Sequence, residues 1–372
     1  MGGTRSNRRW LAPVTAIAVV AGGAVLVPVV ADASPDLPDI TAQQLLTNVQ
    51  GAKVDGLSGV VRSSTDLGLP AIPGLVGSQA LDLITGDHTA RIALAAPDKA
   101  RAAVLDNMAE RVFTTDGKTA WAYDSRSREA TKLTLPAGRA HDKDPGKELG
   151  KAYDPTAVAK QFLDAVDPST EVTVTGTESV AGRDAYVLRL TPRTDQTTVG
   201  SVTLAVDAKE WVPLQVKVLP RAGGDPAVEL GFTEVSFEVP PASTFTFTPP
   251  KGTKVNEEKL PALTDKPGRG EKPHKSEKPV KPGVPDKLGK AGDRPTVVGE
   301  GWSSVVVLKG ASADTASLQP LLANARTLQG SWGSGKVLTT RMVSALFTDD
   351  GRIIVGLVPP EVLESAAAKA PR

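Results

Sequence analysis

The sequence predicts a mainly β protein, in which a large curved antiparallel sheet or barrel is followed by a linker and a small α+β domain. Between residues 171 and 237, apolar and polar side chains alternate in successive short segments, as in an antiparallel sheet with one apolar face and one solvated face. Residues 251–295 are rich in Lys and Pro and nearly lack large apolar side chains, so they cannot bury enough surface to fold. Apolar segments return in residues 296–372.

The composition excludes several classes of function. The 43 Lys and Arg residues nearly balance 42 Asp and Glu residues, and the formal charge of +1 provides no overall field to attract nucleic acid. The absence of cysteine excludes disulfides, thiolate catalysis, cysteine zinc sites and lipid attachment to an N-terminal cysteine. A chain of 372 residues has room for two domains that each bury a core.

Residues 1–33 have the pattern of an export signal. Three arginines within residues 5–9 precede an uncharged apolar run at 10–30. The run ends at Ala31-Asp32-Ala33, a small-residue cleavage pattern that would leave Ser34 as the first mature residue. The alternative is an uncleaved membrane anchor, because the run is long enough to span a bilayer. Both interpretations place the rest of the chain outside the cytoplasmic membrane.

We place the large domain at residues 39–250. Its first half begins with a helix and continues in strands. Residues 41–54 predict a helix, because Thr41 can cap it and Leu45, Leu46 and Val49 recur at helical spacing. Strands are expected at 60–61, 88–97, 100–105, 111–115, 118–123 and 130–135, with the hairpin signal Asp-Gly at 116–117 and a helix at 155–166 that begins after Asp154.

Five further strands are expected at 171–175, 185–190, 201–206, 211–219 and 228–237. The middle three show clear alternation. One face carries Tyr186, Leu188, Leu190, Val202, Leu204, Val206, Val212, Leu214, Val216 and Val218, whereas the other carries Arg189, Thr203, Gln215 and Lys217. A single curved sheet with one apolar face must cover that face with helices or fill it with ligand.

The segment between Asp66 and Asp82, LGLPAIPGLVGSQAL, is apolar although its prolines and glycines prevent a regular helix or strand. Loops are normally polar because they run over the surface. The larger apolar side chains of this segment either fill the core or lie where an apolar ligand passes, and both interpretations stay open. A short helix at 78–84 is also considered. The side chains concerned are Leu67, Leu69, Ile72, Leu75 and Val76.

The sequence offers little for catalysis or metal binding. Of the three histidines, His274 lies in the linker and His141 in a charged stretch, so a catalytic triad or a two-histidine metal site would depend on His88 and one loop histidine. The acidic residues between 142 and 154 lack the glycine and ligand spacing of a calcium loop. No glycine-rich phosphate loop is present. We therefore expect a protein without enzyme activity, cofactor or metal.

Six sequence blocks together carry a resemblance to a known family: AKVDGLSGVV (52–61), DLGLP (66–70), GKTAWAYDS (117–125), GRDAYVLRLTP (182–192), VDAKEWVPLQV (206–216) and FTFTPP (245–250). They resemble the LolA/LolB-like superfamily of lipoprotein carriers and its exported actinobacterial relatives. The resemblance implies an unclosed half-barrel that is covered by helices and holds acyl chains in an apolar cavity. The same half-barrel with a second small domain occurs in RseB/MucB-like regulators, which adds a membrane-bound partner as the alternative.

These observations lead to one leading hypothesis: an exported lipid- or lipoprotein-binding carrier or chaperone of the cell envelope. The alternatives are an RseB-like envelope sensor and a structural protein with a filled core.

Trp121 and Tyr123 share one strand face and are expected either as core aromatics or as part of the ligand site. The expected lining is Leu67, Leu69, Ile72, Leu75, Val76, Trp121, Tyr123, Val202, Leu204, Val206, Val212, Leu214 and Val216.

The linker and the C-terminal region are assigned from composition and pattern. Residues 251–295 contain twelve Lys and Arg against seven Asp and Glu, so they are either a solvated spacer or a basic segment that contacts anionic envelope polymers. Residues 296–372 predict the order β-α-β-β-α, with a strand at 302–308, a mostly helical segment at 317–328, paired strands at 337–347 and 352–358, and a last helix at 360–370. A protein-contact or capping role is expected for this domain.

Overall fold

The computed structural model describes most of the chain that follows the predicted export signal. The described residues are 34–68, 86–106, 109–134, 168–259, 295–308 and 325–370, together with 154, 156–157, 159, 163 and 322–323. The predicted signal or anchor, the short helix expected at 78–84 and most of the Lys/Pro-rich segment lie outside the described residues.

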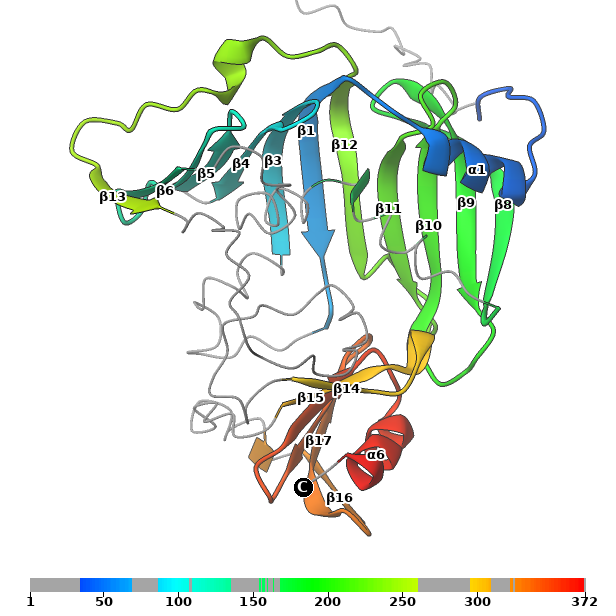
Figure 1. Ribbon diagram of the computed structural model, residues 1–372. Helices are drawn as coiled ribbons and strands as arrows, with labels where there is room; N and C mark the ends of the chain where they lie inside the picture. Colours follow the sequence, from blue (N-terminus) through cyan, green and yellow to red (C-terminus); the bar gives the residue numbers. More distant parts are fainter. Residues whose placement is uncertain are drawn as a thin grey trace, which may run out of the picture. The chain divides into compact units, whose positions relative to one another are not determined.

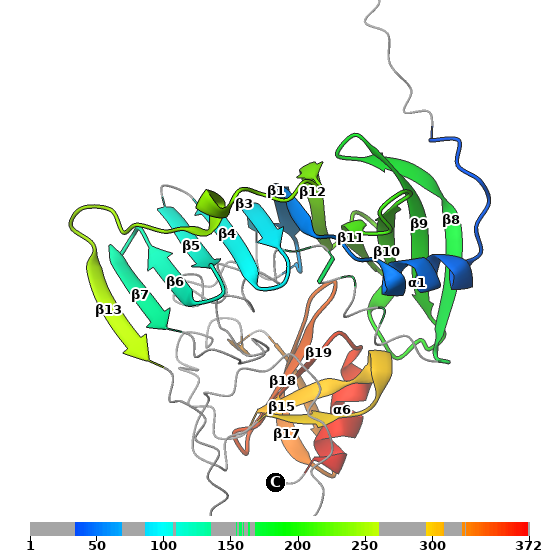
Figure 2. The same ribbon diagram turned by 45° about the horizontal axis from the view of Figure 1, so that its top comes forward.

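A large sheet dominates the structure (Figure 1). Its strand order is β13-β7-β6-β5-β4-β3-β1-β12-β11-β10-β9-β8. All neighbours are antiparallel except β13 and β7, and the strands form a curved row (Figure 2). Within the described residues the sheet has two edges, β8 and β13, so the predicted unclosed, mainly β architecture is confirmed.

The strands run close to the expected positions. Their bounds are β1 Gly56–Thr65, β3 Gly86–Ala95, β4 Lys99–Asp106, β5 Ala109–Thr115, β6 Thr119–Asp124, β7 Glu129–Thr134, β8 Thr170–Val180, β9 Arg183–Pro192, β10 Val199–Asp207, β11 Pro213–Pro220, β12 Val228–Ser236 and β13 Lys254–Lys259.

Helix α1 (Ala42–Gly51) covers part of this sheet and begins as predicted. The Gln44 N–H donates to Thr41 Oγ1 at 3.2 Å and the Thr41 N–H donates to Gln44 Oε1 at 3.0 Å, which completes a capping box. Leu45 is fully buried against apolar side chains of β9, β10 and β11. We call this group the first core cluster; it also contains Ala159 and Leu163 from the predicted helix at 155–166.

A register shift corrects one prediction about the alternating strands. Leu204 pairs with Val216, whereas the neighbouring Val206 pairs with Pro213, so β11 carries an additional residue at Leu214. Such a bulge interrupts the strict alternation of faces. Val216 and Val218 therefore belong to the first core cluster, whereas Val212 and Leu214 pack in a second core cluster with Leu57, Ile92 and Phe232.

The linker was predicted to begin at residue 251, but the large sheet continues beyond that point. Residues 254–259 form β13, which pairs in parallel with β7. Lys254 Nζ lies 2.9 Å from Glu129 Oε1, and Lys132 Nζ lies 3.2 Å from Glu257 Oε1. Composition indicated a segment without apolar side chains, but backbone pairing with an edge strand and cross-strand ion pairs do not require a buried core.

A second, smaller sheet follows, which we call the small-sheet module together with its helix. Its strand order is β14-β15-β19-β18-β17-β16. The bounds are β14 Thr296–Val298, β15 Val305–Leu308, β16 Arg326–Gly330, β17 Gly333–Thr339, β18 Ser344–Thr348, β19 Ile353–Gly356 and α6 Pro360–Lys369. The last helix was predicted. The helix expected at 317–328 is wrong at its end, because residues 326–328 belong to β16; the strand expected at 337–347 is divided by a turn at 340–343.

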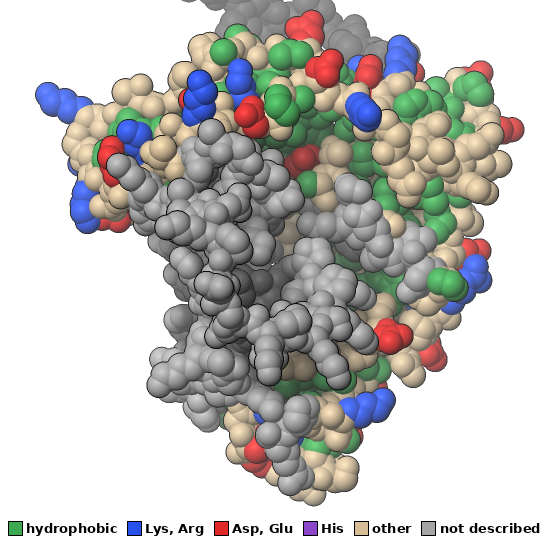
Figure 3. All heavy atoms as spheres, viewed as in Figure 1, with side chains coloured by type: hydrophobic (Ala, Val, Ile, Leu, Met, Phe, Trp, Pro, Cys, Tyr) green, Lys and Arg blue, Asp and Glu red, His purple; other side chains and the backbone are tan. Residues whose placement is uncertain are grey.

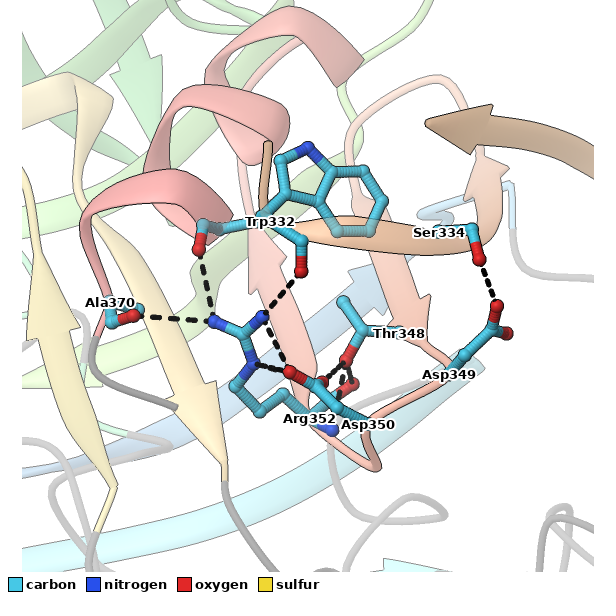
Figure 4. A network of polar contacts seen from close by, with 8 residues as sticks. Trp332, Ser334, Thr348, Asp349, Asp350, Arg352 and Ala370 are labelled. Carbon is cyan, nitrogen blue, oxygen red and sulfur yellow. Dashed lines mark hydrogen bonds and ion pairs between the residues drawn. The ribbon is translucent and has the colours of Figure 1, made fainter. Parts of the chain in front are cut away.

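The buried Arg352 joins this sheet to the end of α6 (Figure 4). Its Nε donates to the Asp350 carboxylate at 2.9 and 3.0 Å. Its Nη1 donates to the carbonyl oxygens of Ala367 at 3.0 Å and Ala370 at 3.4 Å. The last carbonyl groups of a helix have no partner within the helix, so this guanidinium satisfies them and also complements the helix dipole.

Candidate functional site

An apolar pocket of about 320 Å³ lies on one face of strands β3 to β6. The strand register brings its wall together, because Ala102 of β4 is paired with both Ile92 of β3 and Phe113 of β5. Thr115 of β5 is likewise opposite Ala120 of β6. The lining residues are Val54, Asp55, Gly56, Ile92, Leu94, Ala95, Ala96, Pro97, Asp98, Lys99, Ala100, Arg101, Ala102, Phe113, Thr114, Thr115, Ala120, Asp154 and Ala157.

Small side chains create this space. Ala100, Ala102 and Ala120 occupy positions at which larger apolar residues would fill the concavity. The opposite face of the same strands is closed by residues that follow β12. Phe245, in the short helix η1 (Ala242–Phe245), packs against Ala93 and Ala95, so the two faces of this part of the sheet are clearly different.

Charged groups line part of the same pocket. Asp55, Asp98, Lys99, Arg101 and Asp154 are among its lining residues. Burial raises the pKa of Asp154 to about 6, against hydrogen bonds from the Thr156 and Ala157 N–H groups that lower it. The Thr156 N–H donates to Asp154 Oδ1 at 2.9 Å, the geometry expected of a helix N-cap.

In the space-filling view, both charged and hydrophobic side chains of the described residues reach the visible face (Figure 3). Both kinds are expected where apolar and polar side chains alternate along strands.

Trp121 and Tyr123 do not line this pocket. They alternate with Ala120 along β6 and so point to the other face of the sheet. Their ring centroids lie 5.6 and 5.5 Å from that of Phe247, and Lys132 Nζ lies 5.8 Å from the Trp121 ring centroid. Of the two roles expected from the sequence, the structure therefore shows aromatic packing.

The other predicted lining residues are found in three places. Val202, Leu204, Val206 and Val216 are fully or almost fully buried in the first core cluster, where α1 covers them. Val212 and Leu214 belong to the second core cluster. Leu67 packs beside the first cluster, whereas Leu69, Ile72, Leu75 and Val76 lie outside the described residues.

The pocket thus lies in the first half of the sheet, and none of its lining residues was among those selected from the sequence. The available signal was the presence of alanine at alternate positions of one expected strand, Ala100 and Ala102, and at Ala120 of another. Small residues in a strand pattern indicate a place where a sheet face is not filled by its own side chains. Large apolar residues such as Leu204 instead indicated the packed core.

The side chains that line the pocket are mainly apolar. Its described lining contains no His, Cys or Ser that could form a nucleophile and base pair. His88 is buried within β3. Over the part of the chain that the structure describes, no group of three or more His, Asp or Glu side chains is arranged to hold a metal ion. Nor does any helix among the described residues combine the length and apolarity needed to cross a membrane.

A curved, open and mainly antiparallel sheet with an apolar pocket on one face defines the class of architecture. Comparison with solved structures finds the crystal structure of MucB, at 17% identity over 88% of this chain and 96% of that chain, with a TM-score of 0.40. It also finds a LolA superfamily protein from Nitrosomonas europaea, at 14% identity over 56% of this chain and 99% of that chain, with a TM-score of 0.23.

MucB is also found in its complex with MucA(peri), at 17% identity over 88% of this chain and 97% of that chain, with a TM-score of 0.41. No protein-family profile matches the chain. No curated protein sequence matches it either.

Proposed function

We propose that this protein is an exported lipid- or lipoprotein-binding protein of the cell envelope that holds an acyl chain in the apolar pocket. The pocket itself is the observation that supports this function. Its volume of about 320 Å³ is at the lower end of the range for small-molecule sites, roughly 300–1,000 Å³. The cross-strand row of Ile92, Ala102 and Phe113 gives it an aliphatic and aromatic wall suited to methylene groups.

Reversible transfer follows from the nature of the interaction. Removing one methylene group from water contributes about 0.8 kcal/mol. An apolar pocket and a bilayer both provide this gain, so a chain that moves between them loses little free energy. Binding then needs no strong polar anchor, although Asp98 and Lys99 in the pocket lining could contact a headgroup.

The alternative function is that of an envelope sensor, in which ligand occupancy changes a contact with a membrane-bound partner. Contacts of the small-sheet module with the large sheet favour this candidate. Trp302 Nε1 donates to Thr170 Oγ1 at 2.8 Å, and Thr198 Oγ1 donates to the Met342 carbonyl oxygen at 2.6 Å. A module attached in this way would transmit changes from the ligand-binding sheet to a partner.

The first test fills the pocket. Ala100→Phe should place a ring in the cavity and reduce the affinity for a fluorescent fatty-acid probe by at least about tenfold, because the displaced chain loses the burial of two or more methylene groups. The matched control is Thr203→Phe on β10, which lies outside the described pocket lining.

Native mass spectrometry of the purified wild-type protein should also detect co-purified lipid, and less of it in Ala100→Phe. Equal probe affinity in wild type, Ala100→Phe and Thr203→Phe would remove the pocket from the proposal. To separate carrier from sensor, lipid-loaded protein is mixed with lipid-free vesicles. A carrier delivers its lipid, whereas a sensor retains it and instead changes its affinity for a membrane fraction.

A further inference from the structure

The turn between β17 and β18 is a structured projection of the small-sheet module, and we call residues Thr340–Val343 the tip. The Thr340 N–H donates to the Val343 carbonyl oxygen at 2.8 Å. In return, the Val343 N–H donates to Thr340 Oγ1 at 2.9 Å. These two bonds hold the turn in one conformation, so that Arg341 and Met342 are presented at its apex.

Met342 is buried in the core of the large sheet and not in that of its own module. It is 1% exposed and belongs to the first core cluster, together with Val199, Val218 and Ala227. The core of the module, which includes Leu346, Ile354 and Leu363, does not contain it. The Met342 side chain therefore packs in a core that is formed by strands of the large sheet.

The strand register locates the position that Met342 occupies. Val199 at the start of β10 is opposite Pro220 at the end of β11, and Val228 at the start of β12 is opposite Thr65 at the end of β1. These four residues all mark strand ends, so they define one end of this part of the sheet. Met342 fills the apolar core at that end.

Polar contacts also join the small-sheet module to the large sheet near Met342. Thr198 Oγ1 donates to the Met342 carbonyl oxygen at 2.6 Å, and Thr197 Oγ1 donates to the Leu357 carbonyl oxygen at 2.8 Å. Arg341 Nη1 lies 2.9 Å from Asp66 Oδ2, and its Nη2 donates to the Asp225 carbonyl oxygen. The Thr198 contact therefore holds the tip at Met342, and the two Arg341 contacts hold it at the preceding residue.

The relative strength of these contacts shows which one keeps the tip in place. The side chains of Arg341 and Asp66 are 28% and 69% exposed, and ion pairs of this kind contribute little because water screens them. Burial of a Met side chain contributes far more. Its flexible, unbranched thioether also adapts to irregular apolar space. Retention of the tip therefore depends mainly on an apolar side chain that another apolar group could replace.

We propose that the tip is a releasable plug, and that withdrawal of Met342 opens a second apolar site, beside Val199, Val218 and Ala227, that accepts one acyl chain. The inference rests on the proposed function for the chemical class of the ligand. It assigns the small-sheet module a regulatory role, because the same residues close this site and attach the module to the large sheet. The first pocket and this second site lie on different strands, so each can be tested separately.

The test shortens the Met342 side chain and measures how many equivalents of a fatty-acid probe the protein binds. In full-length Met342→Ala, the shortened side chain should leave the site open, and titration with a fluorescent fatty-acid probe should show one additional equivalent bound relative to wild type. The matched control is Leu346→Ala, which makes a comparable cavity within the module's own core. A long probe should not reach that enclosed cavity, so no additional equivalent is expected.

A second variant keeps the core intact. Arg341→Gln removes the ion pair with Asp66 but leaves Met342, and should raise the rate of probe binding to the second site without creating a cavity. Amide hydrogen exchange of residues 66–68 and 197–199 should become several-fold faster in both tip variants and should stay unchanged in Leu346→Ala. This measurement remains informative if Met342→Ala proves poorly stable.

The outcomes separate the two proposals. If wild type binds no probe and Met342→Ala binds one equivalent, the plug is supported and the pocket proposal fails. If wild type and Met342→Ala bind the same number of equivalents, the plug is overturned and the pocket proposal stands. An additional equivalent in Leu346→Ala would also overturn the plug, since any cavity would then suffice.

Discussion

Replacement of Asp154 by Asn should change how the stability of the protein depends on pH. Burial raises the pKa of this carboxyl group from 3.8 to about 6, so the folded protein binds the proton more tightly than the unfolded chain does. Stability is therefore highest below the unfolded pKa and falls as pH rises through the folded pKa. At 1.36 kcal/mol for each pH unit between these two values, the loss reaches about 3 kcal/mol.

Asparagine keeps an acceptor for the Thr156 N–H and is a good N-cap, but it has no charge to desolvate. The free energy of unfolding of wild type and Asp154→Asn should therefore agree at about pH 4, and the variant should be up to about 3 kcal/mol more stable at about pH 8. Urea unfolding followed by tryptophan fluorescence measures both curves. Asp39→Asn at an exposed carboxylate controls for the loss of one negative charge. Parallel curves for wild type and Asp154→Asn would refute the reasoning.

Two further predictions concern the helices. Arg352→Met should lower the free energy of unfolding of the small-sheet module by about 3 kcal/mol or more, because the buried carbonyls of Ala367 and Ala370 lose a charged donor at about 1–3 kcal/mol each. Trp332 fluorescence during urea unfolding measures this loss of stability. Arg352→Lys should not restore the stability. A loss under about 1 kcal/mol in Arg352→Met would contradict the role of Arg352. Thr41→Ala should cost about 1 kcal/mol through loss of the capping box. Thr41→Asn should retain most of that stability in the same measurement, and equal losses in both variants would argue against capping.

The strands of the large sheet could be predicted because their residues repeat with a period of two, and the Thr41 cap because it is a local hydrogen-bonding pattern. The pocket could not be selected in this way. Leu204 and Leu188 are more apolar than Ala100 and Ala102, yet α1 covers the former and the latter line the open space. Whether an apolar strand face is filled depends on which distant segment packs against it, and a sequence pattern contains no such information.

The sequence by itself determined the mainly antiparallel β character, the order of strands along the chain and the helices at 42–51 and 360–369, because these follow from side-chain periodicity and capping over short distances. The tertiary structure alone decided that β1 lies between β3 and β12, that residues 254–259 join the edge at β7, and that Met342 enters the core of the large sheet. Each of these contacts joins residues far apart in the chain. Their free energy comes from burial and from backbone pairing between segments, and so it depends on the arrangement of the whole chain and on no single stretch of residues.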